Sequence, residues 1–425
     1  MKLLIKGGTI VDPVAGAMLA KDILIADGKI FKIDSALSAD GAEVIDATGM
    51  LVTPGLIDMH VHLREPGFEY KEDIASGARA AVRGGFTGVA CMPNTSPVTD
   101  NAATVSYIIE TAKKRAPARV YPIGALTKGS KGVEMAEMGL MREAGATAFS
   151  DDGGAVADAG LMRRAMQYAR MLDAAVIVHC EDKNLSGKGL MHEGYMSTIL
   201  GLPGIPASAE DVIVARDILL AEETGCRLHI AHVSTGRSVE IIRAAKARGV
   251  KVTAEATPHH FTLTDKAVVG YHTATKVNPP LREQRDLDAI KAGLADGAID
   301  VIASDHAPHA PEEKEAEYAL APFGMVGLET TLGLVWTELV ATGLLTPVQA
   351  IAKMTVNPAQ ILGIPRGTLE IGADGDLTII DPALTWTVDP EQFASKSRNT
   401  PFAGRRLVGK AVATFVSGKK IVINN

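Results

Sequence analysis

The sequence has few cysteines, no excess of positive charge and no long apolar run, and each lack excludes a class of protein. Its three cysteines, Cys91, Cys180 and Cys226, are too few and too scattered for a disulfide framework, which favours a reducing compartment. The net charge of -7 argues against a general nucleic-acid binder. No stretch approaches the ~18 apolar residues of a membrane span, and the apolar start breaks at Lys6, too early for a signal peptide. We expect a cytoplasmic protein that binds neither nucleic acid nor membrane.

Both ends of the chain read as short β-strands separated by turns. A length of 425 residues exceeds what one core usually fills, so a large domain and a smaller one are expected. The strand-like runs are Leu3–Val11, Asp22–Ile25, Lys29–Ile33 and Glu43–Ala47 at the start, and Asp376–Ile380, Lys410–Val416 and Lys419–Ile423 at the end. We predict that residues 1–54 and 365–425 form one composite β domain and that residues 55–364 form the larger domain.

The middle of the chain alternates between apolar runs and stretches with helical periodicity. The predicted strands are Leu56–His62, Thr87–Pro93, Val120–Leu126, Thr147–Ser150, Ala175–Cys180, Arg227–Val233, Val250–Ala256 and Asp300–Ser304. The predicted helices are Lys71–Gly84, Asn101–Lys114, Leu161–Leu172, Ala209–Thr224 and Ser238–Arg248. Eight strands alternating with helices predict an α/β fold, either a (β/α)8 TIM barrel or an open doubly wound sheet.

Residues that bind metals stand at the ends of these strands. His60 and His62 lie two apart and project to the same side of an extended chain. Ser150-Asp151-Asp152-Gly153 ends the fourth strand, and His179, His232 and Asp305 end the fifth, sixth and eighth. Each alone is more typical of a polar cap or a turn. Together, at the end of a barrel where active sites lie, they predict a metal centre and favour the barrel.

The types of ligand narrow the choice of metal. Imidazole and carboxylate without thiolate suit zinc, and manganese, cobalt or iron meet the same criteria. Cys180 follows His179 directly and points to the opposite face of the strand, so we interpret it as a small buried apolar residue. Counting back from His232 in the same way, we expect His229 to face away from the centre. His259 and His260 lie near the mouth, where a supporting role and plain packing are equally compatible with the sequence.

Two long motifs carry a resemblance to a known family. The segment Asp58–Gly67 (DMHVHLREPG) resembles the amino-terminal signature of dihydroorotases, and Ala303–His309 (ASDHAPH) is similar to their second signature. A third segment, Pro365–Leu377, resembles the exit segment of the wider amidohydrolase superfamily. The resemblance covers the whole chain from Lys6 onward.

One departure from related enzymes identifies the branch. Hydantoinases, allantoinases and many dihydroorotases bridge two metals with a carboxylated lysine at the end of the fourth strand, whereas this chain has no lysine in Thr147–Asp152. It resembles instead the bacterial type I dihydroorotases, in which an aspartate of a Ser-Asp-Asp-Gly segment serves the metal. The resemblance implies that Asp152 is the ligand, beside His60, His62, His179, His232 and Asp305, and that each chain holds one or two zinc ions.

The resemblance also implies a reaction. The expected activity is the reversible cyclisation of N-carbamoyl-L-aspartate to L-dihydroorotate in de novo pyrimidine (UMP) biosynthesis, with a metal-activated water and Asp305 as the proton shuttle. Arg64 lies two residues past His62, on the same side, and suits the carboxylate of this anionic substrate. By resemblance, Asn94 and His309 join Arg64 there, while Asn278 and the backbone of Phe323 and Gly324 hold the ring amides.

Two other functions compete with this one. Another cyclic amidohydrolase, an allantoinase or a hydantoinase, would use the same fold, although the His-x-His-x-Arg sequence and the missing lysine count against it. An inactive dihydroorotase-like scaffold would usually have lost several metal ligands, and none is missing here. We also expect a homodimer, and the resemblance allows association with aspartate transcarbamoylase.

Overall fold

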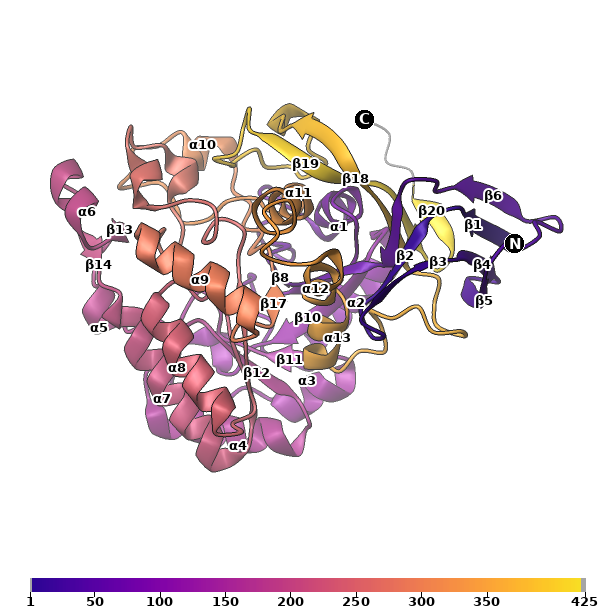
Figure 1. Cartoon of the computed structure of the whole chain (residues 1–425). Helices are drawn as coiled ribbons and strands as arrows, with labels where there is room; N and C mark the ends of the chain where they lie inside the picture. The colour runs from indigo at the N-terminus through magenta and orange to yellow at the C-terminus, as the bar shows by residue number, and fades with distance from the viewer. Residues whose placement is uncertain (1, 422–425) are drawn as a thin grey trace.

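The computed structural model describes residues 2–421, and its centre is a barrel of parallel strands (Figure 1). The strands are β8 (Leu56–Val61), β9 (Phe86–Cys91), β10 (Arg119–Gly124), β11 (Ala148–Phe149), β12 (Ala175–Val178), β15 (Arg227–Ile230), β16 (Val252–Ala256) and β17 (Val301–Ile302). They pair in chain order from β8 to β17. This order confirms the barrel and excludes a doubly wound sheet, in which the strand order would reverse.

The barrel closes between its first and last strands through a buried carboxylate and a short backbone bridge. Asp58 of β8 accepts a hydrogen bond from the backbone N–H of Ser304, at 3.1 Å, just past the end of β17. The same carboxylate accepts a bond from the N–H of His60, at 3.1 Å. Val61 and His306 add one parallel bridge. The chain segments that carry His60 and Asp305 are therefore tied together at the carboxyl end of the barrel.

The helices that follow the strands cover the outside of the barrel. They are α1 (Ile74–Arg83), α2 (Ala102–Arg115), α3 (Met138–Ala144), α4 (Ala159–Met171), α7 (Ser208–Thr224), α8 (Gly236–Ala247), α9 (Gln284–Asp296), α11 (Thr331–Val335), α12 (Pro347–Ala352) and α13 (Val356–Leu362). Helix α1 begins three residues later than predicted because Asp73 is its N-cap and exchanges hydrogen bonds with Ser76.

Strands from both ends of the chain form the second part of the molecule. They are β1 (Lys2–Lys6), β2 (Thr9–Asp12), β3 (Ala17–Ala20), β4 (Asp22–Ala26), β5 (Lys29–Asp34), β6 (Glu43–Asp46), β7 (Leu51–Pro54), β18 (Leu377–Thr387), β19 (Arg406–Val416) and β20 (Lys419–Ile421). Strand β7 pairs antiparallel with β18, and apolar residues of both ends share one core. The fold class is thus as predicted, while the boundaries at residues 54 and 365 stay a prediction.

The prediction of one strand over Leu3–Val11 is wrong. Gly7, with φ of 77°, and Gly8 separate β1 from β2, and the two strands enter different sheets. The turn is held by Asp22, whose carboxylate accepts the N–H of Gly7 at 3.0 Å. This contact lies fifteen positions away in sequence, so local pattern could not reveal it. At the other end, Lys419–Ile423 is a strand up to Ile421, and positions 422 and 423 lie outside the described residues.

A long insertion follows β12 before the barrel resumes at α7. It contains α5 (Lys183–Ser186), β13 (Met191–His192), α6 (Tyr195–Leu200) and β14 (Gly204–Ile205), and it projects from the side of the barrel (Figure 1). Gly187, Gly189 and Ile205 of this insertion line the central pocket. Within residues 2–421, no helix has the length and apolar character that a membrane crossing requires.

Candidate metal centre and substrate pocket

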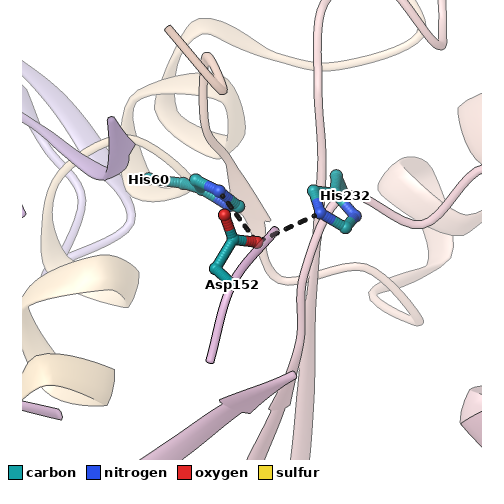
Figure 2. A group of neighbouring side chains, drawn as sticks. All are labelled: His60, Asp152 and His232. Atoms are coloured by element: carbon teal, nitrogen blue, oxygen red, sulfur yellow. Dashed lines mark ion pairs between the residues drawn. The ribbon is translucent and has the colours of Figure 1, made fainter. Parts of the chain in front are cut away.

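The six predicted metal ligands lie together at the carboxyl end of the barrel. Asp152 stands between His60 and His232, as Figure 2 shows, with its Oδ1 atom 3.5 Å from Nε2 of each. A second group shares His60: Asp305 Oδ1 lies 3.5 Å from Nε2 of His60 and 3.0 Å from Nε2 of His62. Within each group the possible ligand atoms all lie within 4.8 Å of one another, close enough to hold a common ion.

His179 completes the cluster from β12. Its Nδ1 atom lies 2.9 Å from Nε2 of His232 and 3.9 Å from Oδ1 of Asp152. Asp151, the neighbour of Asp152, serves the fold instead, because its carboxylate accepts the backbone N–H groups of Leu126 and Thr127 at 2.9 and 3.0 Å. Asp152 thus faces the histidines, while Asp151 binds backbone N–H groups away from them.

Three of the histidines are oriented from behind by oxygen acceptors. Nδ1 of His60 lies 2.5 Å from Glu255, and Nδ1 of His62 lies 2.9 Å from Oδ1 of Asn94. Nε2 of His179 lies 3.0 Å from Glu181. A ring nitrogen held by such an oxygen keeps its proton, so the opposite nitrogen is the one that can bind a metal. In all three histidines this opposite nitrogen faces the cluster, where a bound cation would take the place of any second proton.

The donor set fits a divalent cation. His60 Nε2 and Asp152 Oδ1 are buried and have no hydrogen-bond partner among the described residues. Buried polar atoms are rarely left unsatisfied, and these two lie 3.5 Å apart at the middle of the cluster. Neutral imidazoles and carboxylates that converge without thiolate are the ligands that zinc and similar ions take.

The charges at the centre shift the pKa values of the two kinds of ligand in opposite directions. Burial disfavours charge on both, but the carboxylates of Glu255 and Asp152 raise the pKa of His60 well above its ordinary value. In return, the imidazoles hold the pKa of Asp152 and of Asp305 well below the usual range for a carboxyl. Metal binding requires deprotonated ligands, and a cation would replace the histidine protons as the positive charge.

Backbone conformation shapes the site as much as the side chains do. Arg64, His232 and Asp305 have φ of 63°, 31° and 48°, in the left-handed region that non-glycine residues seldom adopt. Such strain persists only where surrounding contacts impose it. The prediction that His229 faces away is wrong for this reason: the turn at His232 breaks the alternation, and His229 Nε2 lies 3.1 Å from Glu255 beneath the centre.

All six predicted substrate-binding residues line one pocket beside the cluster. The pocket has a volume of about 300 Å³ and is also lined by five of the metal-ligand candidates, all except His60. The substrate-binding residues are Arg64, Asn94, Asn278, His309, Phe323 and Gly324. A small anion in this pocket would therefore touch the metal centre and the predicted contacts at the same time.

Arg64 supplies a fixed positive charge in the pocket. Burial lowers its pKa to about 10, so it stays protonated near neutral pH. Its Nε donates to the carbonyl of Pro308 at 3.1 Å. Burial and the charge of Arg64 lower the pKa of His309 to about 3, so that ring is neutral, and its Nε2 donates to the carbonyl of Phe323 at 2.8 Å.

Three of the remaining predicted substrate contacts, Asn94, Asn278 and Gly324, already make hydrogen bonds within the protein. Asn94 uses its amide oxygen on His62, and Asn278 donates from Nδ2 to Glu181 at 2.9 Å. The N–H of Gly324 donates to the carbonyl of Lys276 at 2.8 Å. The N–H of Phe323, by contrast, makes no hydrogen bond to any of residues 2–421, so it is a backbone donor that a ligand could use.

Two acidic residues of the site were not predicted. Glu255 lies in an otherwise small and apolar strand, where a fully buried carboxylate needs a partner, and this was a readable signal. Glu181 stands two residues after His179, the same spacing that drew attention to His60 and His62. Cys180, between His179 and Glu181, packs in the apolar layer outside the barrel with Val178, as alternation predicts.

A (β/α)8 barrel with paired histidines after its first strand and an acidic–histidine cluster at its carboxyl end defines an amidohydrolase. A model of the family described as dihydro-orotase-like matches residues 49–238. The chain is 69% identical to the dihydroorotase of Pelotomaculum thermopropionicum and 57% identical to that of Citrifermentans bemidjiense, in each case over 99% of both chains. The chain belongs to the dihydroorotase family, and its activity is that of a dihydroorotase.

Solved structures agree on the architecture. L-hydantoinase from Arthrobacter aurescens superimposes with a TM-score of 0.90 at 28% identity, covering 98% of this chain and 95% of the other. Dihydropyrimidinase from Brevibacillus agri gives 0.87 at 25% identity, covering 99% and 95%. The resemblance extends over both the barrel and the terminal β structure.

Proposed function

We propose that this chain interconverts N-carbamoyl-L-aspartate and L-dihydroorotate at a zinc centre built by His60, His62, Asp152, His179, His232 and Asp305. A divalent cation held there would lower the pKa of a coordinated water and polarise the ring carbonyl. The observation that carries the proposal is the convergence of buried, unpartnered His60 Nε2 and Asp152 Oδ1 beside a pocket with a fixed arginine. The two groups that share His60 could hold one ion or two.

Asp305 is the proposed proton shuttle. In the hydrolytic direction a water molecule adds across the ring amide: a C–O bond forms, the C–N bond breaks, and one proton moves from water to nitrogen. Asp305 borders the pocket, and the imidazoles around it keep its carboxylate ionised and able to accept that proton. It then passes the proton to the departing nitrogen, and the reverse sequence closes the ring.

Arg64 is the proposed anchor for the substrate carboxylate, with Asn94 and neutral His309 beside it. A guanidinium can bind both carboxylate oxygens at once. Asn278 and Phe323 line the same pocket, and the Asn278 side chain and the free N–H of Phe323 would hold the ring amide groups. These contacts leave the ring carbonyl facing the metal ligands, where the hydrolytic water attacks.

The proposal is tested by zinc analysis and dihydroorotate turnover for the wild type and Asp305→Ala. We expect zinc to be retained, if more weakly, and turnover to be lost, because one ligand group remains intact without Asp305. Near-normal turnover of the variant would refute the shuttle. Turnover of hydantoin or allantoin faster than of dihydroorotate would refute the substrate.

We further propose a cytoplasmic enzyme that works as a homodimer and can associate with aspartate transcarbamoylase, the enzyme that makes its substrate. Native mass spectrometry of the purified chain, alone and mixed with that transcarbamoylase, tests both assemblies. A monomer that forms no complex would contradict them without affecting the catalytic proposal.

A further inference from the structure

A buried lysine holds the loop that brings Phe323 to the pocket. Lys276 follows η3 (Thr273–Thr275) and is only 2% exposed. Its Nζ donates to the carbonyls of Tyr318, Ala319 and Ala321, at 2.8, 3.1 and 2.6 Å. An ammonium group has three N–H donors, so these three carbonyls use all of them.

The environment of this ammonium is unusual for a buried cation. Within residues 2–421 no carboxylate forms an ion pair with Lys276, although buried lysines are normally paired with one. Carbonyl dipoles and the ring of Phe323, whose centroid lies 4.8 Å from Nζ, take the place of a counter-ion. Burial accordingly lowers the pKa of Lys276. Burying this unpaired ammonium is unfavourable, and its contacts with the loop carbonyls of residues 318–321 suggest that its role is to hold that loop.

A second lysine acts on the next carbonyl of the same loop. Lys314, at the end of α10 (Pro311–Lys314), is 8% exposed and donates from Nζ to the carbonyl of Pro322 at 2.7 Å. In a planar trans peptide the C=O and the following N–H point in opposite directions. Holding the Pro322 carbonyl therefore fixes where the N–H of Phe323 points, and this is the donor that no described residue uses.

We propose that Lys276 and Lys314 are positioning residues that fix residues 318–322 by their carbonyls and so aim the backbone of Phe323 at the substrate. Neither lysine lines the pocket, so both act through the loop. The inference rests on the proposed function in one respect, that Phe323 contacts the substrate. The lysines would set the affinity for the substrate and leave the metal centre unaffected.

The test compares Lys276→Met, Lys314→Met and a matched control, Lys353→Met. Lys353 is also buried and donates to a carbonyl, that of Ile299, at 2.6 Å, but it lies at the opposite end of β17 from Asp305. Methionine keeps the length of the side chain and removes the charge. Each full-length variant is measured for zinc content, melting temperature, kcat and KM with dihydroorotate.

We expect Lys276→Met to raise KM about tenfold or more, because a charge-assisted hydrogen-bond set is lost, with kcat nearly constant and zinc retained. Lys314→Met should raise KM less, since it loses one bond. Lys353→Met should lower the melting temperature without changing KM. If Lys276→Met does not fold, Lys314→Met decides the question. Equal KM values in all three variants would overturn the proposal.

Hydrogen exchange of residues 318–325 separates this inference from the proposed function. Faster exchange there in Lys276→Met, and not in Lys353→Met, supports the proposal that the lysines fix this loop, whatever the substrate is. Unchanged exchange overturns it, even if the wild type turns over dihydroorotate. A wild type that does not turn over dihydroorotate would instead refute the proposed function.

Discussion

Glu255 lies directly behind His60, with its carboxylate 2.5 Å from Nδ1 and both side chains fully buried. The same carboxylate accepts the N–H of His232 at 3.2 Å and lies 3.1 Å from His229. One acidic residue of β16 thus orients ligand candidates from two other strands. Burial opposes its ionisation, but the charge of His60 lowers the pKa of Glu255 to about 2.

Glu255→Gln should weaken zinc binding about 10- to 100-fold, the usual effect of losing a carboxylate behind a ligating histidine. Glutamine also places an NH2 group against one of the donors that Glu255 now satisfies. The measurement is competition for zinc with a chelator. Glu329→Gln is the control, because the Glu329 carboxylate is likewise buried but accepts from Ala394 and Ser395 and forms no ion pair or hydrogen bond with a metal-ligand candidate among the described residues. Equal zinc affinity in both variants would contradict the role of Glu255.

Arg64→Lys should raise KM for dihydroorotate by about 10- to 100-fold, because a lysine cannot bind both carboxylate oxygens in the arginine geometry. Zinc content should not change. For dihydrouracil, which has the same ring without the carboxylate, the substitution should change kcat/KM little or not at all. The measurement is kcat/KM for the two substrates, with Arg119→Lys as control, since Arg119 pairs with Asp374 and Asp376 outside the pocket. A variant that still prefers dihydroorotate as strongly as the wild type would show that another group reads the carboxylate.

Glu329 should make the free energy of unfolding depend on pH. Burial raises its pKa to about 7 in spite of backbone donors and Arg83. The folded state then binds its proton more tightly than the unfolded chain, so this residue lowers the free energy of unfolding as pH rises from about 4.5 to 7. Glu329→Gln should flatten the slope across that window by at most about 1.4 kcal/mol per pH unit. Urea unfolding of both proteins from pH 5 to 8 checks this, and parallel slopes would contradict the shift.

Sequence pattern was sufficient wherever the determining contacts are local. The alternation of Leu56–Val61 placed His60 and His62 on one side, and the strand and helix periods located every barrel strand to within a few residues. Sequence pattern failed where a contact with a residue distant in sequence determines the local conformation. Gly7 turns because Asp22 binds it, and the left-handed conformation at His232 breaks the alternation that would have placed His229 on the opposite side.

The sequence by itself predicted the barrel, the candidate ligand residues and the resemblance to dihydroorotases, because these depend on short-range periodicity and on residue types at fixed spacing. Only the tertiary structure decided which carboxylates stand behind the histidines, since Glu255 reaches His60 across the closed barrel from a strand 195 positions later in the chain. It also decided that Phe323 keeps a free N–H while Gly324 does not, because Lys276 and Lys314 reach that loop only once the chain has folded.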